Sequence, residues 1–143
     1  MILGLTGSRK GLTDEQVVSF LSLVKELNSE SRISTVNHGD CTGSDADMHK
    51  LLAGILGNVF ILHPASGVEA QFQANCTPFR WRFLPLPPLQ RNENIVAVSD
   101  VLIATPKGKE SVRSGTWATV RYARKTGVKI YIIYPDGIIE TNP

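Results

Sequence analysis

Residues 1–10, MILGLTGSRK, hold the stretch that decides the fold class of this chain. A short apolar run covers residues 1–6, and Gly7 ends it, which is typical of a buried strand followed by a tight turn. Apolar runs without polar alternation are typical of strands that helices cover on both faces, as in parallel sheets. We therefore expect the chain to begin with a buried strand of a parallel sheet.

The rest of the chain repeats this kind of strand and alternates it with helical patterns. Further apolar runs, each typical of a strand, cover residues 32–39, 58–64, 100–106 and 128–135. The alternation predicts an α/β fold, a Rossmann-like three-layer sandwich with helices on both faces of one sheet. We expect a mostly parallel, five-stranded sheet with the strand order 3-2-1-4-5.

Helices are expected in the connections between these strands. Thr13, with Gln16 three residues later, forms a capping-box pattern at the start of the first helix. The other helices are expected over residues 43–57, around Arg91–Ser99 and after Gly115.

Residues 65–90 interrupt the alternation. Four prolines forbid a regular helix there, and aromatic side chains alternate with arginines. Long irregular segments in small domains are usually functional or mobile. Two interpretations stay open: a surface loop fixed by its aromatic side chains, or a lid over a ligand.

Composition and charge are those of a globular protein. Hydrophobic residues make up 42% and charged residues 20% of the 143 residues, which we interpret as one domain, residues 1–143. The formal net charge of +2 is too small for overall charge to bind nucleic acid. Cys41 and Cys76 form neither a disulfide framework nor a metal-ligand spacing. Without signal-peptide features or an apolar stretch of about 18 residues, we expect a cytoplasmic protein with no membrane partner.

Three polar loops follow expected strands and should meet at one edge of the sheet. They are TGSR (residues 6–9), NHGDCTGSD (residues 37–45) and TPKGKESVRSGT (residues 105–116). Ligands of open α/β sheets bind beyond the carboxyl ends of the strands, where the strand order reverses. The sequence therefore predicts a ligand site between the first and fourth expected strands.

Two of these loops have features of phosphate sites. Gly7 lets the backbone turn sharply so that the N–H groups beyond it, from Ser8 onward, can point at an anion, and Arg9 adds a planar cation. Residues 114–116, Ser-Gly-Thr, open a helix whose N-terminal N–H groups favour a phosphate. The cations at the other end of that helix complement its dipole and are poor site candidates: Arg121, Arg124 and Lys125.

The loop at residues 37–45 is rich in glycine and aspartate. Gly39 and Gly43 bracket a turn, and Ser44 or Thr42 can cap the next helix. Asp40, Asp45 and Asp47 lie at the same helix end. They either stabilise the helix, each by about 0.3–1 kcal/mol, or bind ribose hydroxyls or a Mg²⁺ ion near a phosphate. We expect His38 to be structural, because no second histidine or cysteine is spaced to join it as a metal ligand.

Four motifs, in order and spacing, resemble the SLOG superfamily. They are GLTGSR (4–9), HGDCTGSDADMH (38–49), RNENIVAVSDVLIATP (91–106) and SGTWATVRYARKTG (114–127), before a last strand and PDG. This Rossmann-like group includes the lonely-guy phosphoribohydrolases and the Smf DNA-processing proteins. The likeness covers nearly the whole chain and is to small single-domain bacterial and phage members.

The resemblance implies a nucleotide or nucleotide-derived ligand over the carboxyl edge of the sheet. In the lonely-guy branch an arginine before the fourth strand and a glutamate in a Gly-Gly-x-Gly-Thr-x-x-Glu motif carry N-glycosidic hydrolysis. Arg91 falls at the arginine position and Asn92 follows it, whereas Thr119 stands at the glutamate position. A hydroxyl cannot stabilise the positive charge that develops on the sugar as a carboxylate does. Asp40, Asp45 or Glu110 would have to replace that glutamate from a neighbouring loop.

These observations define the predicted site. The ligand-binding residues are expected to be Gly7, Ser8, Arg9, Gly39, Asp40, Gly43, Ser44, Asp45, Arg91, Asn92, Ser114, Gly115 and Thr116. The candidate catalytic residues are Arg91 and Asp45. No protein metal site is expected, and Mg²⁺ beside a phosphate is the one cofactor under consideration.

Three functions are compatible with the sequence. The leading hypothesis is a protein that binds a nucleotide-type small molecule, as a sensor or sequestering module. The alternative is an enzyme, an N-glycosidase or phosphoribohydrolase or a deoxyribosyltransferase, that uses a carboxylate of the acidic loop. The third is binding of single-stranded DNA through Arg80, Arg82 and Arg91 near aromatic side chains, which the low net charge opposes. The apolar surface of residues 65–90 favours a homo-oligomer.

Overall fold

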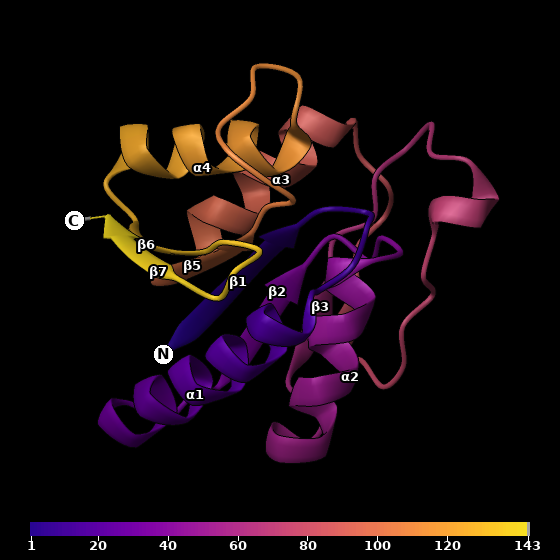
Figure 1. Ribbon diagram of the computed structural model, residues 1–143. Coiled ribbons are helices and arrows are strands. Elements are labelled where there is room, and N and C mark those ends of the chain that lie inside the picture. The colour runs from indigo at the N-terminus through magenta and orange to yellow at the C-terminus, as the bar shows by residue number, and fades with distance from the viewer. Residues whose placement is uncertain (143) are drawn as a thin grey trace.

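A seven-stranded sheet forms the middle layer of the computed structural model, which describes residues 1–142 (Figure 1). Its strand order is β4-β3-β2-β1-β5-β6-β7, and all neighbours are parallel except β6 and β7. The strands are β1 (Ile2–Gly7), β2 (Thr35–His38), β3 (Phe60–Leu62), β4 (Trp81–Arg82), β5 (Val101–Thr105), β6 (Lys129–Ile133) and β7 (Ile139–Asn142). The α/β class and the mostly parallel sheet are confirmed.

The prediction of five strands is wrong, because the sheet carries an extra strand at each edge. The five expected strands are neighbours in the order β3-β2-β1-β5-β6, and β4 and β7 flank them. β4 is two exposed residues inside the proline-rich segment, too short to leave an apolar run in the sequence. β7 pairs antiparallel with β6 after a tight turn, in which the N–H of Gly137 donates to the carbonyl of Tyr134 at 2.8 Å.

Helices cover both faces of the sheet (Figure 1). α1 (Asp14–Glu30) and α2 (Ser44–Leu56) lie on one face, and α3 (Pro88–Val98) and α4 (Gly115–Thr126) lie on the other. The capping box of Thr13 and Gln16 at the start of α1 is confirmed. α3 begins at Pro88 rather than near Arg91, because proline is well suited to the first turn of a helix.

Two apolar cores hold these layers together. On one face, Phe20 and Val24 of α1 and Met48 and Leu52 of α2 are fully buried against the sheet. On the other, Trp117 of α4 packs with its neighbours against β5 and β6. Burial of this kind contributes about 1.5–3 kcal/mol per large side chain. It fixes the register in which Gly7 lies beside Thr105, so the carboxyl ends of β1 and β5 meet at one edge.

The three polar loops are numbered in chain order: the first loop is residues 6–9, the second loop residues 37–45 and the third loop residues 105–116. The proline-rich segment, residues 65–87, runs along the outer side of the second loop (Figure 1). The segment contains a short 3₁₀ helix (Ala70–Phe72) and β4. It is tied to the second loop by two backbone bonds, from the N–H of Thr42 to Phe72 and from the N–H of Ala74 to Asp40, at 3.0 and 2.9 Å. No helix of the described residues is long and apolar enough to cross a membrane.

α3 and α4 cover only part of their face of the sheet. These two helices pack against β1, β5 and β6. Over β2, β3 and β4, two adjoining apolar hollows of about 590 and 480 Å³ remain open. Both are lined by His63, Trp81, Phe83 and Val98. We call this surface the open face.

Candidate functional site

A pocket of about 580 Å³ lies at the carboxyl edge of the sheet, where the three polar loops meet. This volume is in the range of small-molecule sites. The structure brings together all the predicted ligand-binding residues except Asp40, Gly43 and Ser44. The residues that line the pocket and were predicted are Gly7, Ser8, Arg9, Gly39, Asp45, Arg91, Asn92, Ser114, Gly115 and Thr116.

The first loop approaches α2 so closely that only glycine fits at position 7. A Cβ atom there would collide with the side chains of Ser44 and Thr105. The carbonyl of Ser8 accepts the backbone N–H of Ser44 at 2.9 Å, which joins the two loops. The hydroxyl oxygens of Ser8 and Ser44 are buried and have no hydrogen-bond partner among the described residues. Such orphaned hydroxyls are typical of a site that binds water or a ligand.

Among the described residues, Asp45 is the one that brings a carboxyl group to the pocket. Its Oδ2 accepts the backbone N–H groups of Gly39 and Cys41 at 3.1 and 3.3 Å. Burial raises the pKa of Asp45 to about 6, although the nearby Arg91 guanidinium and the two N–H donors lower it. The carboxyl therefore exchanges a proton close to neutral pH.

The predicted cap of α2 is wrong. Gly43 occupies the N-cap position with φ of 88°, and no side chain caps the helix there. Neither Ser44 nor Thr42 takes that role, because Ser44 is already helical and its hydroxyl has no partner. A Cβ at Gly43 would collide with the backbone of Arg9, so this glycine lets the two loops touch.

Arg91 lies on α3 and links this helix to the second loop and to the residue that follows β3. Its Nη1 donates to the carbonyl oxygens of Gly39 and His63 at 2.8 and 3.0 Å, and its Nε donates to Oδ1 of Asn92 at 2.7 Å. The residue is only 9% exposed. Most of its donors are therefore used inside the protein, and one side of the guanidinium lines the pocket.

The third loop presents the N-terminus of α4 to the pocket. Ser114 is the N-cap, and its Oγ accepts the N–H of Trp117 at 3.2 Å. The N–H groups of Gly115 and Thr116 have no intrahelical partner, as in the first turn of any helix. The first turn holds no acidic residue. This helix end therefore offers free donors and the positive end of a helix dipole.

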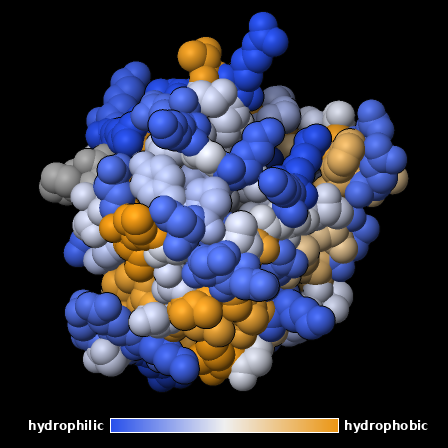
Figure 2. All heavy atoms as spheres, viewed as in Figure 1, coloured by the Kyte–Doolittle hydropathy of each residue, from blue (hydrophilic) through white to orange (hydrophobic). Residues whose placement is uncertain are grey.

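Sequence reasoning missed three cations of the pocket. Lys10, Lys107 and Arg113 line it together with Arg9 and Arg91. Among the described residues, the arginines in ion pairs are Arg82, Arg121 and Arg124. Hydrophilic side chains predominate in the upper part of the molecule in Figure 2, where the third loop and α4 lie. Only the topology shows that these lysines and Arg113 surround one pocket, since nothing local distinguishes them from solvated surface cations.

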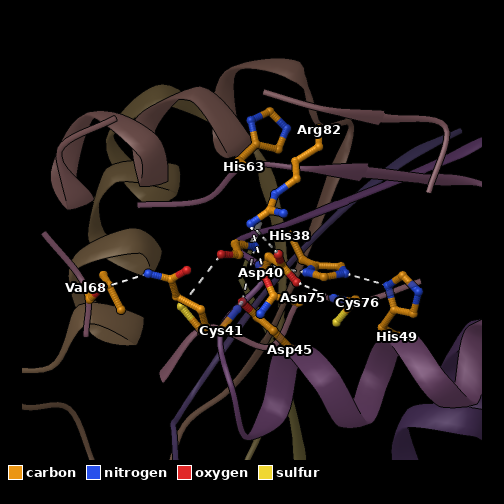
Figure 3. Close-up of polar contacts among 12 residues, drawn as sticks. His38, Asp40, Cys41, Asp45, His49, His63, Val68, Asn75, Cys76 and Arg82 are labelled. Carbon is orange, nitrogen blue, oxygen red and sulfur yellow. Dashed lines mark hydrogen bonds and ion pairs between the residues drawn. The ribbon is translucent and has the colours of Figure 1, made fainter. Parts of the chain in front are cut away.

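Asp40 does not line the pocket, contrary to prediction, and its carboxyl group faces Arg82 (Figure 3). Its Oδ1 accepts the backbone N–H of Cys76 at 2.8 Å, and its Oδ2 lies 3.4 Å from Nη2 of Arg82. Its φ of 55° turns the side chain toward the proline-rich segment. Asp40 therefore fastens that segment to the second loop.

The three aspartates of the second loop and the first turn of α2 do not converge. Asp47 accepts the backbone N–H of Leu12 at 3.0 Å, Asp40 faces Arg82, and only Asp45 lines the pocket. A Mg²⁺ ion beside a phosphate keeps several waters and needs only one or two carboxylates from the protein. Asp45 is the aspartate of this set in the pocket, so Mg²⁺ beside a phosphate stays a prediction for that carboxyl alone.

The reason given for a structural His38 is wrong, because His49 and Cys76 join it in space (Figure 3). One potential ligand atom from each of the three lies within 4.8 Å of the others. However, Nδ1 of His38 accepts the N–H of Asp40 at 3.0 Å, so its proton is on Nε2, which donates to Nδ1 of His49 at 2.8 Å. A histidine that binds a metal through one ring nitrogen donates the N–H of its other ring nitrogen to an acceptor. His38 cannot do so, because its Nδ1 is itself an acceptor. The arrangement is that of a buried neutral histidine pair.

Two positions considered for a catalytic carboxylate lie outside the pocket. Thr119 is 1% exposed, and its hydroxyl donates to the carbonyl of Gly115 at 2.9 Å. Glu110 is exposed and pairs with Arg121 and Arg124 at 3.2 and 3.0 Å. Neither group lines the pocket.

Comparison with protein-family models, with curated proteins and with solved structures found no match to this chain. The resemblance of its motifs to the SLOG superfamily therefore stays a prediction.

Proposed function

We propose that the protein binds a nucleotide or a nucleotide-derived ligand in the pocket at the carboxyl edge, as a sensor or a sequestering module. The observation that carries this proposal is the convergence of three loops on one pocket with five cationic side chains and one carboxyl group. Anions are favoured by such a charge balance and by a free helix N-terminus.

The pocket offers a place for each part of such a ligand. The N–H groups of Gly115 and Thr116, with the guanidinium of Arg9, suit a phosphate. Asp45 and Asn92 supply oxygen acceptors for ribose hydroxyls. Binding without turnover fits the absence of a second carboxyl group among the described residues that line the pocket. Thr119 has no carboxyl group, and Glu110 lies outside the pocket.

A second candidate function is N-glycosidic hydrolysis with Asp45 as the catalytic carboxyl. One observation favours it: the carboxyl is buried, lines the pocket and has a pKa raised to about 6. Groups that titrate near the working pH suit general acid–base catalysis. Arg91 beside it would be a positioning residue, because its donors already bind Gly39, His63 and Asn92.

Binding of single-stranded DNA has no such support. Arg80 donates to the carbonyl oxygens of Asn58 and Ser34, Arg82 pairs with Asp40, and Arg91 is buried. These guanidinium groups are therefore committed to contacts within the protein rather than to stacking on bases.

Calorimetry with adenosine, guanosine and cytidine monophosphates tests the proposed binding. Arg9→Ala and Gly115→Asp should each weaken binding at least about tenfold, the loss of one charge-assisted hydrogen bond. A Cβ at Gly115 meets nothing within 4 Å, so the aspartate adds charge without a collision. Arg124→Ala, whose partner Glu110 lies outside the pocket, is the control. Unchanged binding in both test variants would contradict this site.

Turnover distinguishes the two candidate functions. The wild type and Asp45→Asn are incubated with each nucleotide, and free base is measured by chromatography. Bound ligand without base release supports the sensor or sequestering function. Rapid base release that Asp45→Asn abolishes would replace it with the hydrolase.

A further inference from the structure

The charge of the pocket exceeds what one phosphate group neutralises. Five cationic side chains and one carboxyl group line it, a formal charge of +4 when Asp45 is ionised. The whole chain has a net charge of +2, so the residues outside the pocket carry −2. A phosphate monoester carries a charge of about −2 near neutral pH. Such a ligand would leave half of this local excess unneutralised.

Four of the five cations come from two separate stretches of the chain. Arg9 ends the first loop and Lys10 follows it, and Lys107 and Arg113 belong to the third loop. The ion pairs found among residues 1–142 involve none of these four side chains. Like charges gathered around one hollow repel each other, and an anion bound between them relieves this repulsion.

The hydrogen-bond donors of the pocket also come from two loops. Ser8 of the first loop lines the pocket and has a buried hydroxyl without a partner among the described residues. Gly115 and Thr116 offer N–H groups from the third loop. A chain of phosphoryl groups has oxygen acceptors along its length and can bind both sets of donors.

We infer that the ligand carries two or more linked phosphoryl groups, as in a nucleoside diphosphate or triphosphate, rather than one. This inference rests on the proposed nucleotide site. The first phosphate binds at the α4 N-terminus with Arg9, and the further phosphoryl groups bind Lys107 and Arg113. Each further group adds about one negative charge near neutral pH.

Calorimetry with AMP, ADP, ATP, inorganic phosphate and pyrophosphate, all in EDTA, tests this inference. ADP should bind at least about tenfold more tightly than AMP, and ATP more tightly again, since a charge-assisted contact contributes about that factor. The double variant K107A/R113A should remove most of this advantage and leave AMP binding within about threefold. Lys125→Ala, at the far end of α4, is the matched control for loss of a cation.

The outcomes separate this inference from the proposed function. Equal affinities for AMP, ADP and ATP would overturn the inference and leave the nucleotide site standing. An ADP advantage that K107A/R113A preserves would also overturn it. Pyrophosphate binding as tight as that of ADP would support linked phosphoryl groups but contradict a nucleoside contribution. No binding of any nucleotide or of pyrophosphate would defeat both proposals.

Discussion

Arg91 is a single residue on which the geometry of the site depends. It is buried and satisfies the carbonyl oxygens of Gly39 and His63, while its charge lies near Asp45. Arg91→Ala should therefore lower the free energy of unfolding by about 3 kcal/mol, because it removes the donor to two buried carbonyl oxygens and a cation near the buried carboxyl group of Asp45. Urea denaturation measures this change. Arg113→Ala removes an exposed cation of the same pocket and should alter stability by less than about 0.5 kcal/mol. A loss in Arg91→Ala as small as that in Arg113→Ala would contradict the structural role of Arg91.

The buried histidines predict how stability depends on pH. Burial lowers the pKa of His38 to about 3 and, together with Arg91, that of His63 to about 4. Between these values and about 6.5 the unfolded chain binds protons that the folded protein does not, so stability falls as the pH falls through this range. Each histidine contributes a slope of up to about 1.4 kcal/mol per pH unit.

Asp45 has the opposite sign. Its pKa is raised from 3.8 to about 6, so the folded protein binds the extra proton, and this contribution is lost as the pH rises through that interval. Asp45→Asn should therefore steepen the loss of stability on acidification below pH ~6, as measured by urea denaturation at several pH values. A wild-type stability that stays constant from pH ~6.5 to ~4.5 would contradict neutral histidines in the folded state.

At the scale of elements, glycines decide how closely the loops approach each other. Gly43 and Gly57 flank α2 with nearly the same backbone, φ of 88° and 74° with ψ of −129° and −149°. A Cβ at Gly43 would collide with the backbone of Arg9, whereas at Gly57 it meets nothing within 4 Å. Alanine at either position should cost about 1–3 kcal/mol of backbone strain.

Gly43→Ala should cost additional stability and should also weaken nucleotide binding, because the collision moves the first loop. Gly57→Ala is the matched control, since it carries the same strain without the collision. Thermal unfolding and calorimetry measure the two effects. If Gly57→Ala destabilises the protein as much as Gly43→Ala, the contact with Arg9 does not matter.

Elements with a local signal could be predicted from the sequence, and elements without one could not. The apolar runs of β1 and β5 and the capping box at Thr13 depend on residues close in sequence, and the structure confirms them. β4 depends instead on pairing with β3, and its two residues have no pattern of their own. The start of α3 has no clear local signal, because a proline such as Pro88 is equally typical of a helix break and of the first turn of a helix.

The same distinction applies to the candidate site. Topology places Gly7, Arg9 and Ser114 around one pocket, as the loop order predicts. The direction of Asp40 depends on its φ of 55° and on Arg82, 42 positions later in the chain, and neither is visible in a motif. The contact of His38 with His49 likewise requires the packing of α2 on the sheet.

At the scale of the whole molecule, the open face predicts association of two chains. Trp81 is 57% and Leu84 is 86% exposed beside the apolar hollows, together with Phe83 and Val98. An exposed leucine beside a hollow on the same surface suits a two-fold arrangement, in which Leu84 of each copy fills the hollow of the other copy.

We therefore expect a homodimer in sedimentation equilibrium. Leu84→Asp and Trp81→Asp should shift it to the monomer, because each buries a charge in an apolar contact. Val18→Asp is the control, because Val18 is 70% exposed and belongs to α1, which covers the other face of the sheet. A wild type that is monomeric at all concentrations, or dissociation by Val18→Asp alone, would contradict an interface on the open face.

The two outermost strands of the sheet, β4 and β7, determine whether further chains can add to its edges. An unpaired strand edge is a template on which further chains can add, without limit, as in fibrils. Here one edge is β4, only two residues long, and the other is β7 (Ile139–Asn142), which includes the polar residues Glu140 and Thr141. Short or polar edges protect against such growth. These edges therefore disfavour polymerisation of the chain along its strands.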